Sequence, residues 1–491
     1  MTRRTQALSG LHKENRPMSL PTHTGARVVG RLLAVLAVLA LLGACGTTPD
    51  PKPTDLTPPE QPAPEPEPTP DPVDPEIIKA SGIQEWEMDG LKVVLKPTPG
   101  PVVIAELIIQ GGLTNTTPET DGVEELALRV ASSGGTTDTP RDAFTSRLNS
   151  MGSEIGHDTD RDYSTLTMRS IRPYWTQTWE LFGEVLLSPA FTDKQIELQR
   201  TRQIEEIKGI QDNPDDYVGI LASQSHFDGH PYVRRTVGTE ASVKKLTRDM
   251  LVTYYRGLMT RERLTLVVVG DLKRAEVEEA VRSSLATLPK GDYTFPGLPP
   301  VPEKPSKVAT QVRPELPTNY MIGLFNAPAP THPDYFPMLV ATSLLSDRFF
   351  EEVRTKRNLT YAVAAGLSKR RRNYGYLYVT AVDPTTTVQV MYDEVERLAT
   401  RELDPKGFGE LVNVFLTEHY MRAETTAAQA SLLANAEMTG GGWEQTLVFI
   451  QNIEKVTPED VMRVTKTYIK DIHWGYIGDP GKADMNVLTS R

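Results

Sequence analysis

The chain has 491 residues, of which 39% are hydrophobic and 24% are charged. It is therefore long enough for two or three domains with cores of ordinary globular composition. The formal net charge of −11 argues against a nucleic-acid partner, because no basic stripe stands out beyond Lys369–Arg372. We interpret that basic run as a solvated turn.

The first 45 residues have the features of a lipoprotein signal. Arg27 and Arg31 precede the apolar run LLAVLAVLALLGAC, which is too short to span a bilayer comfortably and suits a secretory signal. The run ends at Cys45 in Leu-Gly-Ala-Cys, which looks like a bacterial lipobox whose cysteine is lipidated and becomes the new N-terminus. A buried structural cysteine is the alternative, but the chain has a single cysteine and none to pair with it.

The signal predicts a location in the bacterial cell envelope. We expect a lipid anchor in a membrane, with the folded part on the periplasmic side. Gly46 stands where an aspartate retains lipoproteins at the inner membrane in some bacteria, which slightly favours the outer membrane. Because the segment before the apolar run is long for a signal, Met18 competes with Met1 as the start.

Composition divides the rest of the chain. Residues 46–75 are rich in Pro, Glu and Asp, a composition that cannot build a core and acts as a semi-rigid spacer. A second Pro-rich stretch follows at 295–306. We predict five segments: signal peptide 1–45, tether 46–75, N-terminal domain 76–294, linker 295–306 and C-terminal domain 307–491.

The N-terminal domain shows alternating strand patterns and helical periodicity. In chain order we predict strands at 90–97 and 102–112, helices at 122–133 and 141–152, a strand pair at 153–158 and 161–171, helices at 173–189, 193–211 and 214–227, a helix from Thr247, and a strand at 264–272.

The C-terminal domain repeats this order of elements, which suggests a duplication. We predict strands at 309–314 and 319–326, a helix at 334–357, a strand pair at 360–368 and 374–382, helices up to Tyr468, and a closing strand at 473–478.

Several motifs in this order resemble one peptidase family. They are GVEELALRVA from Gly122, GSEIGHDTDRDYSTL from Gly152, the stretch from HPYVRRTVGTE to VVVGDL (230–272), and RTKRNLTY (354–361). Over about residues 80–485 the chain is similar to the pitrilysin/insulinase-like zinc peptidases, in particular to subunits related to the mitochondrial processing peptidase. The resemblance implies an α+β fold of two homologous α/β sandwich domains, each a sheet flanked by helices, enclosing a cavity.

The resemblance also locates a degenerate zinc motif. Active family members carry His-x-x-Glu-His on a helix, and here Glu125 and Arg129 stand at the two His positions and Leu128 at the Glu position. The third family ligand falls on Glu206. Zinc catalysis needs neutral imidazole or anionic ligands and a base that activates water, which Leu128 and Arg129 do not supply. We therefore predict no metal, no other cofactor, and no peptidase activity of the chain alone.

Arg129 has a second interpretation, based on charge. Glu125 and Arg129 are four residues apart with the acid first, the favourable helical order for an ion pair. The guanidinium would also lie near Glu206 and replace part of the missing metal charge. The alternative is that Glu206 is a surface carboxylate on an amphipathic helix. Gln199 and Gly156 stand where the family has Glu and Asn, so peptide docking in this half is also altered.

The histidines give weaker signals. His226 and His230 are four apart and could share a metal, but no Glu base stands between them, and we expect His230 to satisfy a loop hydrogen bond. His157 lies next to the strand that would meet a substrate. No Gly-x-Ser-x-Gly or phosphate-loop pattern is present, and Cys45 is committed to the lipid site.

Arg354 and Tyr361 match a pair that, in active relatives, lies across the cavity from zinc and orients the peptide. An arginine fork and a tyrosine hydroxyl can bind a carbonyl and stabilise an oxyanion; the alternative is a purely structural role in packing. Some bacterial relatives form pairs in which one subunit supplies the zinc motif and the other this Arg/Tyr pair.

Two hypotheses of function follow. In the favoured one the chain is the catalytically inactive, substrate-positioning subunit of a heteromeric periplasmic zinc peptidase, with a homologous zinc-bearing partner and unstructured peptides as ligands. In the alternative it is a stand-alone peptide-binding pseudoprotease lipoprotein or an envelope scaffold. A peptidase that uses another metal is a third, weaker reading.

Overall fold

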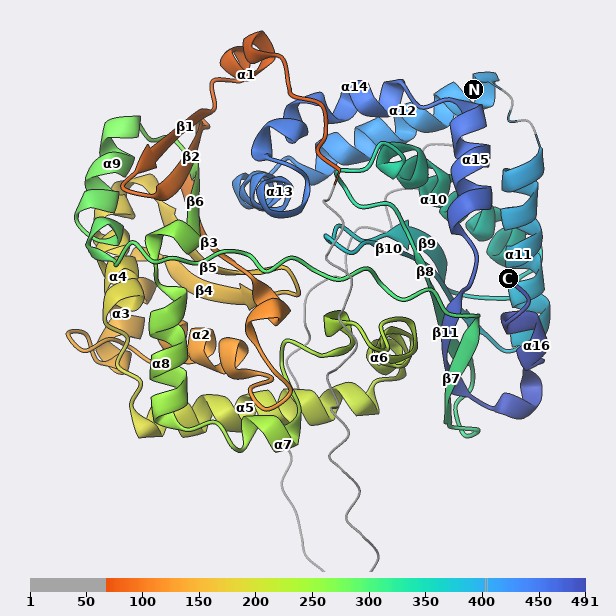
Figure 1. Cartoon of the computed structure of the whole chain (residues 1–491), viewed down its shortest axis with the longest axis horizontal. Coiled ribbons are helices and arrows are strands. Elements are labelled where there is room, and N and C mark those ends of the chain that lie inside the picture. The colour runs from red at the N-terminus through yellow and green to blue at the C-terminus, as the bar shows by residue number, and fades with distance from the viewer. Residues whose placement is uncertain (1–67, 402, 404) are drawn as a thin grey trace, which may run out of the picture. The chain divides into compact units, whose positions relative to one another are not determined.

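The computed structural model describes residues 68–401, 403 and 405–491. Cys45, the signal and most of the tether lie outside these residues, so the lipid anchor stays a prediction. Figure 1 shows two β-sheets with helices packed against them, and both sheets belong to one compact unit of the chain. Among the described helices, none is long and apolar enough to cross a membrane.

The first sheet has six strands in the order β1-β2-β6-β3-β5-β4. Its strands are β1 (Gln84–Met88), β2 (Leu91–Pro97), β3 (Val102–Gln110), β4 (Glu154–Thr159), β5 (Tyr163–Ile171) and β6 (Leu264–Gly270). Strands β2 and β6 are parallel and the other neighbours are antiparallel. The order leaves β4 at one edge of the sheet.

The helices that accompany this sheet are α1 (Pro75–Ser81), α2 (Val123–Ser133), α3 (Arg141–Met151), α4 (Trp175–Leu187), α5 (Asp193–Asp212), α6 (Pro214–His226), α7 (Glu240–Val243), α8 (Arg248–Leu258) and α9 (Arg274–Arg282). Local chemistry sets several of their ends. The Thr192 side chain caps α5 by accepting from the amide of Gln195, and the Asn213 side chain caps α6, which has proline at its first position, as helix N-termini favour.

The second sheet has five strands in the order β7-β11-β8-β10-β9. They are β7 (Lys307–Val312), β8 (Asn319–Asn326), β9 (Val363–Leu367), β10 (Tyr374–Ala381) and β11 (His473–Gly478). The helices of this half are α10 (Tyr335–Phe349), α11 (Pro384–Thr400), α12 (Pro405–Arg422), α13 (Thr426–Thr439), α14 (Phe449–Glu454), α15 (Pro458–Tyr468) and α16 (Met485–Leu488).

Short 3-10 helices and one π-helix lie between these elements. They are η1 (Gly112–Asn115), η2 (Arg172–Tyr174), η3 (Pro231–Val233), η4 (Arg261–Arg263), η5 (Leu285–Thr287), the π-helical η6 (Phe350–Thr355), η7 (Trp443–Val448) and η8 (Pro480–Lys482). The predicted helix at 334–357 is therefore α10 followed by η6. Strand β1 and helix α9 were not predicted. The predicted α+β class, with two sheets flanked by helices, is confirmed.

The first sheet is buried on both faces. On one face Val93, Leu95 and Leu107 pack with α2, α4 and α8 in the main core. On the other face Ile104 and Val267 pack against α13, a helix from the second half of the chain. Because both faces of the sheet are covered, β6 is buried along its whole length. Its sequence is therefore a continuous apolar run, as is usual for strands covered on both sides.

Helix α6 packs against β8 and β11 of the second sheet. Gly475 in β11 allows this close approach, because a Cβ there would collide with backbone atoms of Val218 and Ala222 in α6. Helix α6 thus links the first half of the chain directly to the second sheet.

The basic run Lys369–Arg372 corrects one prediction. Three of its arginines are half-buried and engaged: Arg370 pairs with Asp160, the Arg371 amide donates to Asp162 at 3.1 Å, and Arg372 Nε donates to the Pro299 carbonyl at 2.8 Å. The expectation of a solvated turn was wrong. The acceptors come from the first half and the linker, which no local pattern around the run could indicate.

Candidate functional site

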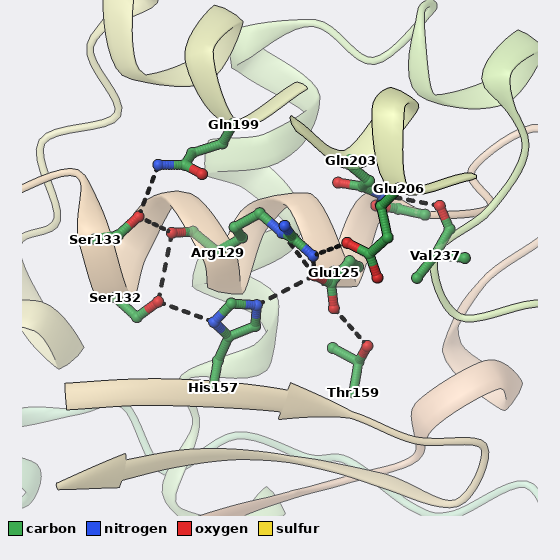
Figure 2. A network of polar contacts seen from close by, with 11 residues as sticks. Glu125, Arg129, Ser132, Ser133, His157, Thr159, Gln199, Gln203, Glu206 and Val237 are labelled. Carbon is green, nitrogen blue, oxygen red and sulfur yellow. Dashed lines mark hydrogen bonds and ion pairs between the residues drawn. The ribbon is translucent and has the colours of Figure 1, made fainter. Parts of the chain in front are cut away.

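The candidate site lies where α2 runs between the edge strand β4 and helix α5 (Figure 2). Glu125, Arg129, Ser132 and Ser133 fall on one side of α2, because positions separated by four, seven and eight residues share a helix face. His157 and Thr159 are two residues apart on β4, so their side chains lie on the same face of the strand. That face is turned toward α2.

An arginine bridges two carboxylates at the centre of this site. Arg129 Nε donates to Glu125 Oε1 at 2.7 Å, and Arg129 Nη2 donates to Glu206 Oε2 at 2.7 Å. The Glu125 side chain is only 7% exposed, whereas that of Glu206 is 44% exposed. The structure therefore brings together the three charged residues that the sequence grouped, with the guanidinium lying between the acids.

A histidine and a threonine complete the binding of Glu125. His157 Nε2 lies 3.2 Å from Glu125 Oε1, and the Thr159 hydroxyl donates to Glu125 Oε2 at 2.6 Å. The other ring nitrogen of His157 lies 3.0 Å from Ser132 Oγ. Sequence reasoning missed this link, although the two-residue spacing of His157 and Thr159 on a strand beside the degenerate motif could have indicated it.

These contacts decide the charge of Glu125. Burial raises the pKa of this carboxyl, but the hydrogen bond and charge of His157, the charge of Arg129 and the hydroxyl of Thr159 outweigh burial and lower the pKa to about 2. Burial lowers the pKa of Arg129, but the charges and hydrogen bonds of Glu125 and Glu206 raise it by more. The pKa of Arg129 is therefore raised overall. At neutral pH the site holds an ionised, fully partnered carboxylate.

Two glutamine residues of α5 form hydrogen bonds that hold helix α2 in place. Gln199 Nε2 donates to Ser133 Oγ at 3.0 Å, and Ser133 Oγ donates to the Arg129 carbonyl at 2.6 Å. Gln203 Nε2 donates to the carbonyls of Gly122 at 3.2 Å and Val237 at 2.9 Å. Gln199 thus holds α2 through a neutral hydrogen bond.

The residues present do not fit the zinc ion that the family resemblance implies. Arg129, which the sequence comparison expects at the position of one ligand, is a permanent cation and pairs with Glu125 and Glu206. Leu128, which is expected at the position of the base, is fully buried in the main core and offers no polar atom. Within residues 68–401, 403 and 405–491, no group of three or more His, Cys, Asp or Glu side chains is placed to hold a metal.

The structure also brings Arg354 and Tyr361 together. The Arg354 guanidinium carbon lies 4.9 Å from the centre of the Tyr361 ring and 4.8 Å from that of Phe350, distances that suit cation–π contact. Tyr361 is 81% exposed. In the described part of the chain, no hydrogen bond or ion pair joins this pair to Glu125, Arg129 or their partners, so its role stays a prediction.

The two spaced histidines serve the fold. His230 Nδ1 accepts from the Tyr232 amide at 3.1 Å, and Nε2 faces the Pro299 carbonyl at 3.0 Å, which confirms the expected loop hydrogen bond. Burial, followed by the charges of His473, Arg161 and His230, lowers the pKa of His226 to about 3. Burial likewise lowers the pKa of His230 to about 4. Both are neutral side chains of the interior.

Comparison with known proteins identifies the family and the fold. The family description "Insulinase (Peptidase family M16)" matches residues 92–240, and "Peptidase M16 inactive domain" matches residues 245–414. A solved protease from Helicobacter pylori has the same fold, with a TM-score of 0.74 at 15% identity over 80% of this chain and 99% of that one.

Relatives of the chain carry different names. The uncharacterized zinc protease YmxG of Bacillus subtilis is 22% identical over 73% of this chain and 87% of its own length. The non-peptidase homolog YmxG of Helicobacter pylori is 20% identical over 78% and 90%. A probable mitochondrial-processing peptidase subunit beta of Arabidopsis thaliana is 23% identical over 75% and 73%. The chain belongs to the peptidase M16 (insulinase) family and contains both its N-terminal and its C-terminal domain.

Proposed function

We propose that the chain is a catalytically inactive member of its family that positions peptides for a homologous, zinc-bearing partner subunit. The observation that carries this proposal is the arginine bridge. Arg129 donates to both Glu125 and Glu206, so a permanent cation occupies the space where the family's chemistry needs a metal. Replacing that cation by zinc would require breaking a half-buried ion-pair network, which is strongly unfavourable when one partner is removed.

Two features support a role in peptide positioning. Strand β4 is an edge strand, and an extended peptide can add to such an edge by backbone hydrogen bonds. Exposed Tyr361 and half-buried Arg354 form a pair that can donate to a peptide carbonyl or to a developing oxyanion. A relative named as a non-peptidase homolog and another named as a processing-peptidase subunit agree with an inactive subunit in a larger assembly.

The proposed location is the periplasmic side of the bacterial envelope, with Cys45 lipidated. Affinity purification of the full chain from its native membrane tests the partnership. We expect a homologue that carries His-x-x-Glu-His to co-purify. If none does, the chain acts alone as a peptide-binding pseudoprotease. Stoichiometric zinc in the purified chain, with cleavage that a chelator inhibits, would overturn the proposal as a whole.

The Arg/Tyr pair allows a sharper test in the reconstituted complex. Arg354→Ala and Tyr361→Phe should lower kcat/KM on an unstructured peptide by about 10²–10³, the usual cost of losing one preorganised oxyanion donor, without changing zinc content or assembly. Arg202→Ala, an exposed arginine of α5, and Tyr420→Phe, an exposed tyrosine of α12, are matched controls. Equal rates for all four variants and wild type would reduce Arg354 and Tyr361 to packing residues.

A further inference from the structure

A cavity of about 390 Å³ lies beside the candidate site. Its walls come from α6, from the C-terminal sheet through Tyr374 and Tyr376 of β10, and from two arginines of the first half, Arg161 and Arg235. Arg161 follows Thr159 by two residues at the β4–β5 turn. Arg235 precedes Val237 by two residues, and the Val237 carbonyl accepts from Gln203 of the candidate site. A peptide lying along β4 would therefore reach this cavity.

Both arginines have donors without a partner. Arg161 Nη2 donates to Ser223 Oγ at 2.7 Å, but its Nη1 is buried and has no acceptor in the described part of the chain. Nη2 of Arg235 is buried and equally unmatched. Burial lowers the pKa of both guanidinium groups. A partly buried charge with an unmatched buried donor costs folding free energy, so two such arginines lining one cavity require an explanation.

The nearby acids do not neutralise these cations. Glu206 is bound by Arg129, and Asp160 is bound by Arg370. Asp216 lines the cavity at the first turn of α6, where its Oδ2 accepts from Asn213 Nδ2 at 2.7 Å. None of these carboxylates is placed within ion-pair distance of either cavity arginine in the described residues. The lining therefore carries a net positive charge, from two arginines and the single carboxylate of Asp216.

The remaining walls are apolar and aromatic. Ile322 and Leu324 of β8 and the rings of Tyr374 and Tyr376 also line the cavity. The Arg161 guanidinium carbon lies 5.0 Å from the centre of the Phe227 ring and 5.9 Å from that of Tyr374, so aromatic faces hold the fork in place. Planar guanidinium groups beside an apolar wall suit a single carboxylate attached to an apolar side chain.

We propose that this cavity binds a peptide carboxylate through Arg161 and Arg235, with the adjoining side chain against the apolar wall. This inference rests on the proposed peptide-positioning function and names the chemical group that the chain selects. Removing Arg235 should then have opposite effects on the two states of the protein. The ligand-free protein gains stability because an unpaired buried cation disappears, whereas the bound carboxylate loses its donor. A purely structural arginine would show the reverse in the free state.

The first test uses small probes and the intact soluble chain. Thermal shift and calorimetry compare N-acetyl-leucine with its amide at neutral pH. We expect the acid to raise Tm and the amide to leave it unchanged. Arg235→Gln should raise the ligand-free Tm and weaken binding of the acid at least tenfold. Arg202→Gln, which removes the same charge from the exposed face of α5, should change neither. Equal shifts by acid and amide, or full binding by Arg235→Gln, would overturn the proposal.

A second variant blocks the cavity without touching the arginines. Gly219 of α6 lines the cavity, and a Cβ there would meet no atom within 4 Å. Gly219→Leu should therefore fold, since leucine is a better helix former than glycine, and should abolish binding of the acid by filling the cavity. Gly209→Leu, at a similarly open position of α5, is the matched control. Undiminished binding by Gly219→Leu would place the carboxylate elsewhere and contradict the assignment.

Further arms identify the source of the carboxylate and separate this inference from the proposed function. N-acetyl-glutamate α-amide carries its only carboxylate on the side chain, so comparison with N-acetyl-leucine distinguishes an acidic residue from a chain terminus. Inorganic phosphate that stabilises as strongly as either acid would overturn the preference for carboxylate. An amidated unstructured peptide that binds without any gain from a free carboxylate contradicts the cavity alone. Carboxylate binding without peptide binding contradicts the proposed function alone.

Discussion

Glu125 is the carboxylate on which Arg129, His157 and Thr159 converge. A buried carboxylate with three donors is stable only while it is ionised, since protonation removes the charge that these donors bind. The low pKa of Glu125 therefore means that its ionised form stabilises the contact between α2 and β4. It also explains why the site tolerates a charged residue at 7% exposure.

The pH dependence of unfolding tests this. The pKa of Glu125 is about 2 in the folded chain against about 4.5 ordinarily, so its contribution is present above pH 4.5 and is lost as the pH falls toward 2. The shift corresponds to up to about 3 kcal/mol. Urea unfolding of Glu125→Gln should show this deficit at pH 7 and a shrinking deficit below pH 4.5. Glu205→Gln, on the exposed face of α5, should match wild type throughout.

How far the sequence predicts such a site depends on the sequence distance between its partners. The Glu125–Arg129 pair follows from helical spacing, and its contact with Glu206 follows from the motif register. The His157 contact depends on β4 running beside α2, which spacing within α2 cannot indicate. The arginines of 370–372 were misassigned because their acceptors lie in another half of the fold.

Helix α13 covers the face of the first sheet that lies opposite α2. Its residues Ala430, Leu433 and Ala434 pack on β3 and β6, where small side chains allow the helix to approach the sheet closely. A buried acid lies within this apolar face: Glu106 of β3 is 6% exposed, and Ser431 of α13 donates to it at 3.5 Å. The contact between this helix and the sheet therefore includes an ionisable group with a weak hydrogen bond.

Glu106 should make this contact pH-dependent in the opposite sense to Glu125. Burial raises the pKa of Glu106 to about 7, with Ser431 lowering it and Asp158 raising it by smaller amounts. The folded chain therefore holds this proton more tightly than the unfolded chain, and stability is lost as the pH rises from about 4.5 through 7. At pH 8 the ionised side chain costs up to about 3 kcal/mol.

Glu106→Gln should remove that cost, raising stability at pH 8 and leaving it unchanged at pH 4.5. Hydrogen exchange of the α13 amides gives the local measurement, after correction for the intrinsic rate. Exchange should accelerate with pH in wild type and not in the variant. Glu154→Gln on the exposed side of β4 is the control. Identical α13 protection in Glu106→Gln and wild type at pH 8 would mean that the carboxylate is solvated by another route.

The elements themselves were largely predictable, and their packing was not. Alternation and periodicity gave most strands and helices in chain order, because each pattern is local. Helix α13 was anticipated only as part of a helical stretch, since its alanine-rich sequence has no strongly polar face that marks an outer side. Its position on the first sheet follows from the close approach that Ala430 and Ala434 permit, which a pattern within one helix does not reveal.

Polar contacts help to explain why the two halves form one compact unit. Asp162, fully buried at the end of the β4–β5 turn, accepts from the Tyr232 hydroxyl and from the Arg371 amide of the second half. Leu298 of the Pro-rich stretch packs with Phe227 and Leu324 in a small core of its own. A buried carboxylate and a short apolar cluster thus join segments that are far apart in sequence.

The contact of Asp162 with Tyr232 and Arg371, which we call the joint, allows a last prediction. Tyr232→Phe keeps the aromatic packing and removes one donor from the buried Asp162, which should cost about 2 kcal/mol. In an Asp162→Asn background the same change should cost less, giving a coupling energy of about 1 kcal/mol or more in a double-mutant cycle. Tyr420→Phe, on an exposed side chain of α12, should cost nothing.

Trypsin reports whether the lost free energy acts at the joint. It cleaves after arginine, and Arg370, Arg371 and Arg372 are half-buried and engaged with the first half and the linker. Native-state cleavage at these arginines should accelerate in Tyr232→Phe about as much as stability falls, since proteolysis follows the population of opened molecules. If Tyr232→Phe destabilises the chain while cleavage there keeps the wild-type rate, then Asp162 stabilises the first half alone and the two halves are held together by other contacts.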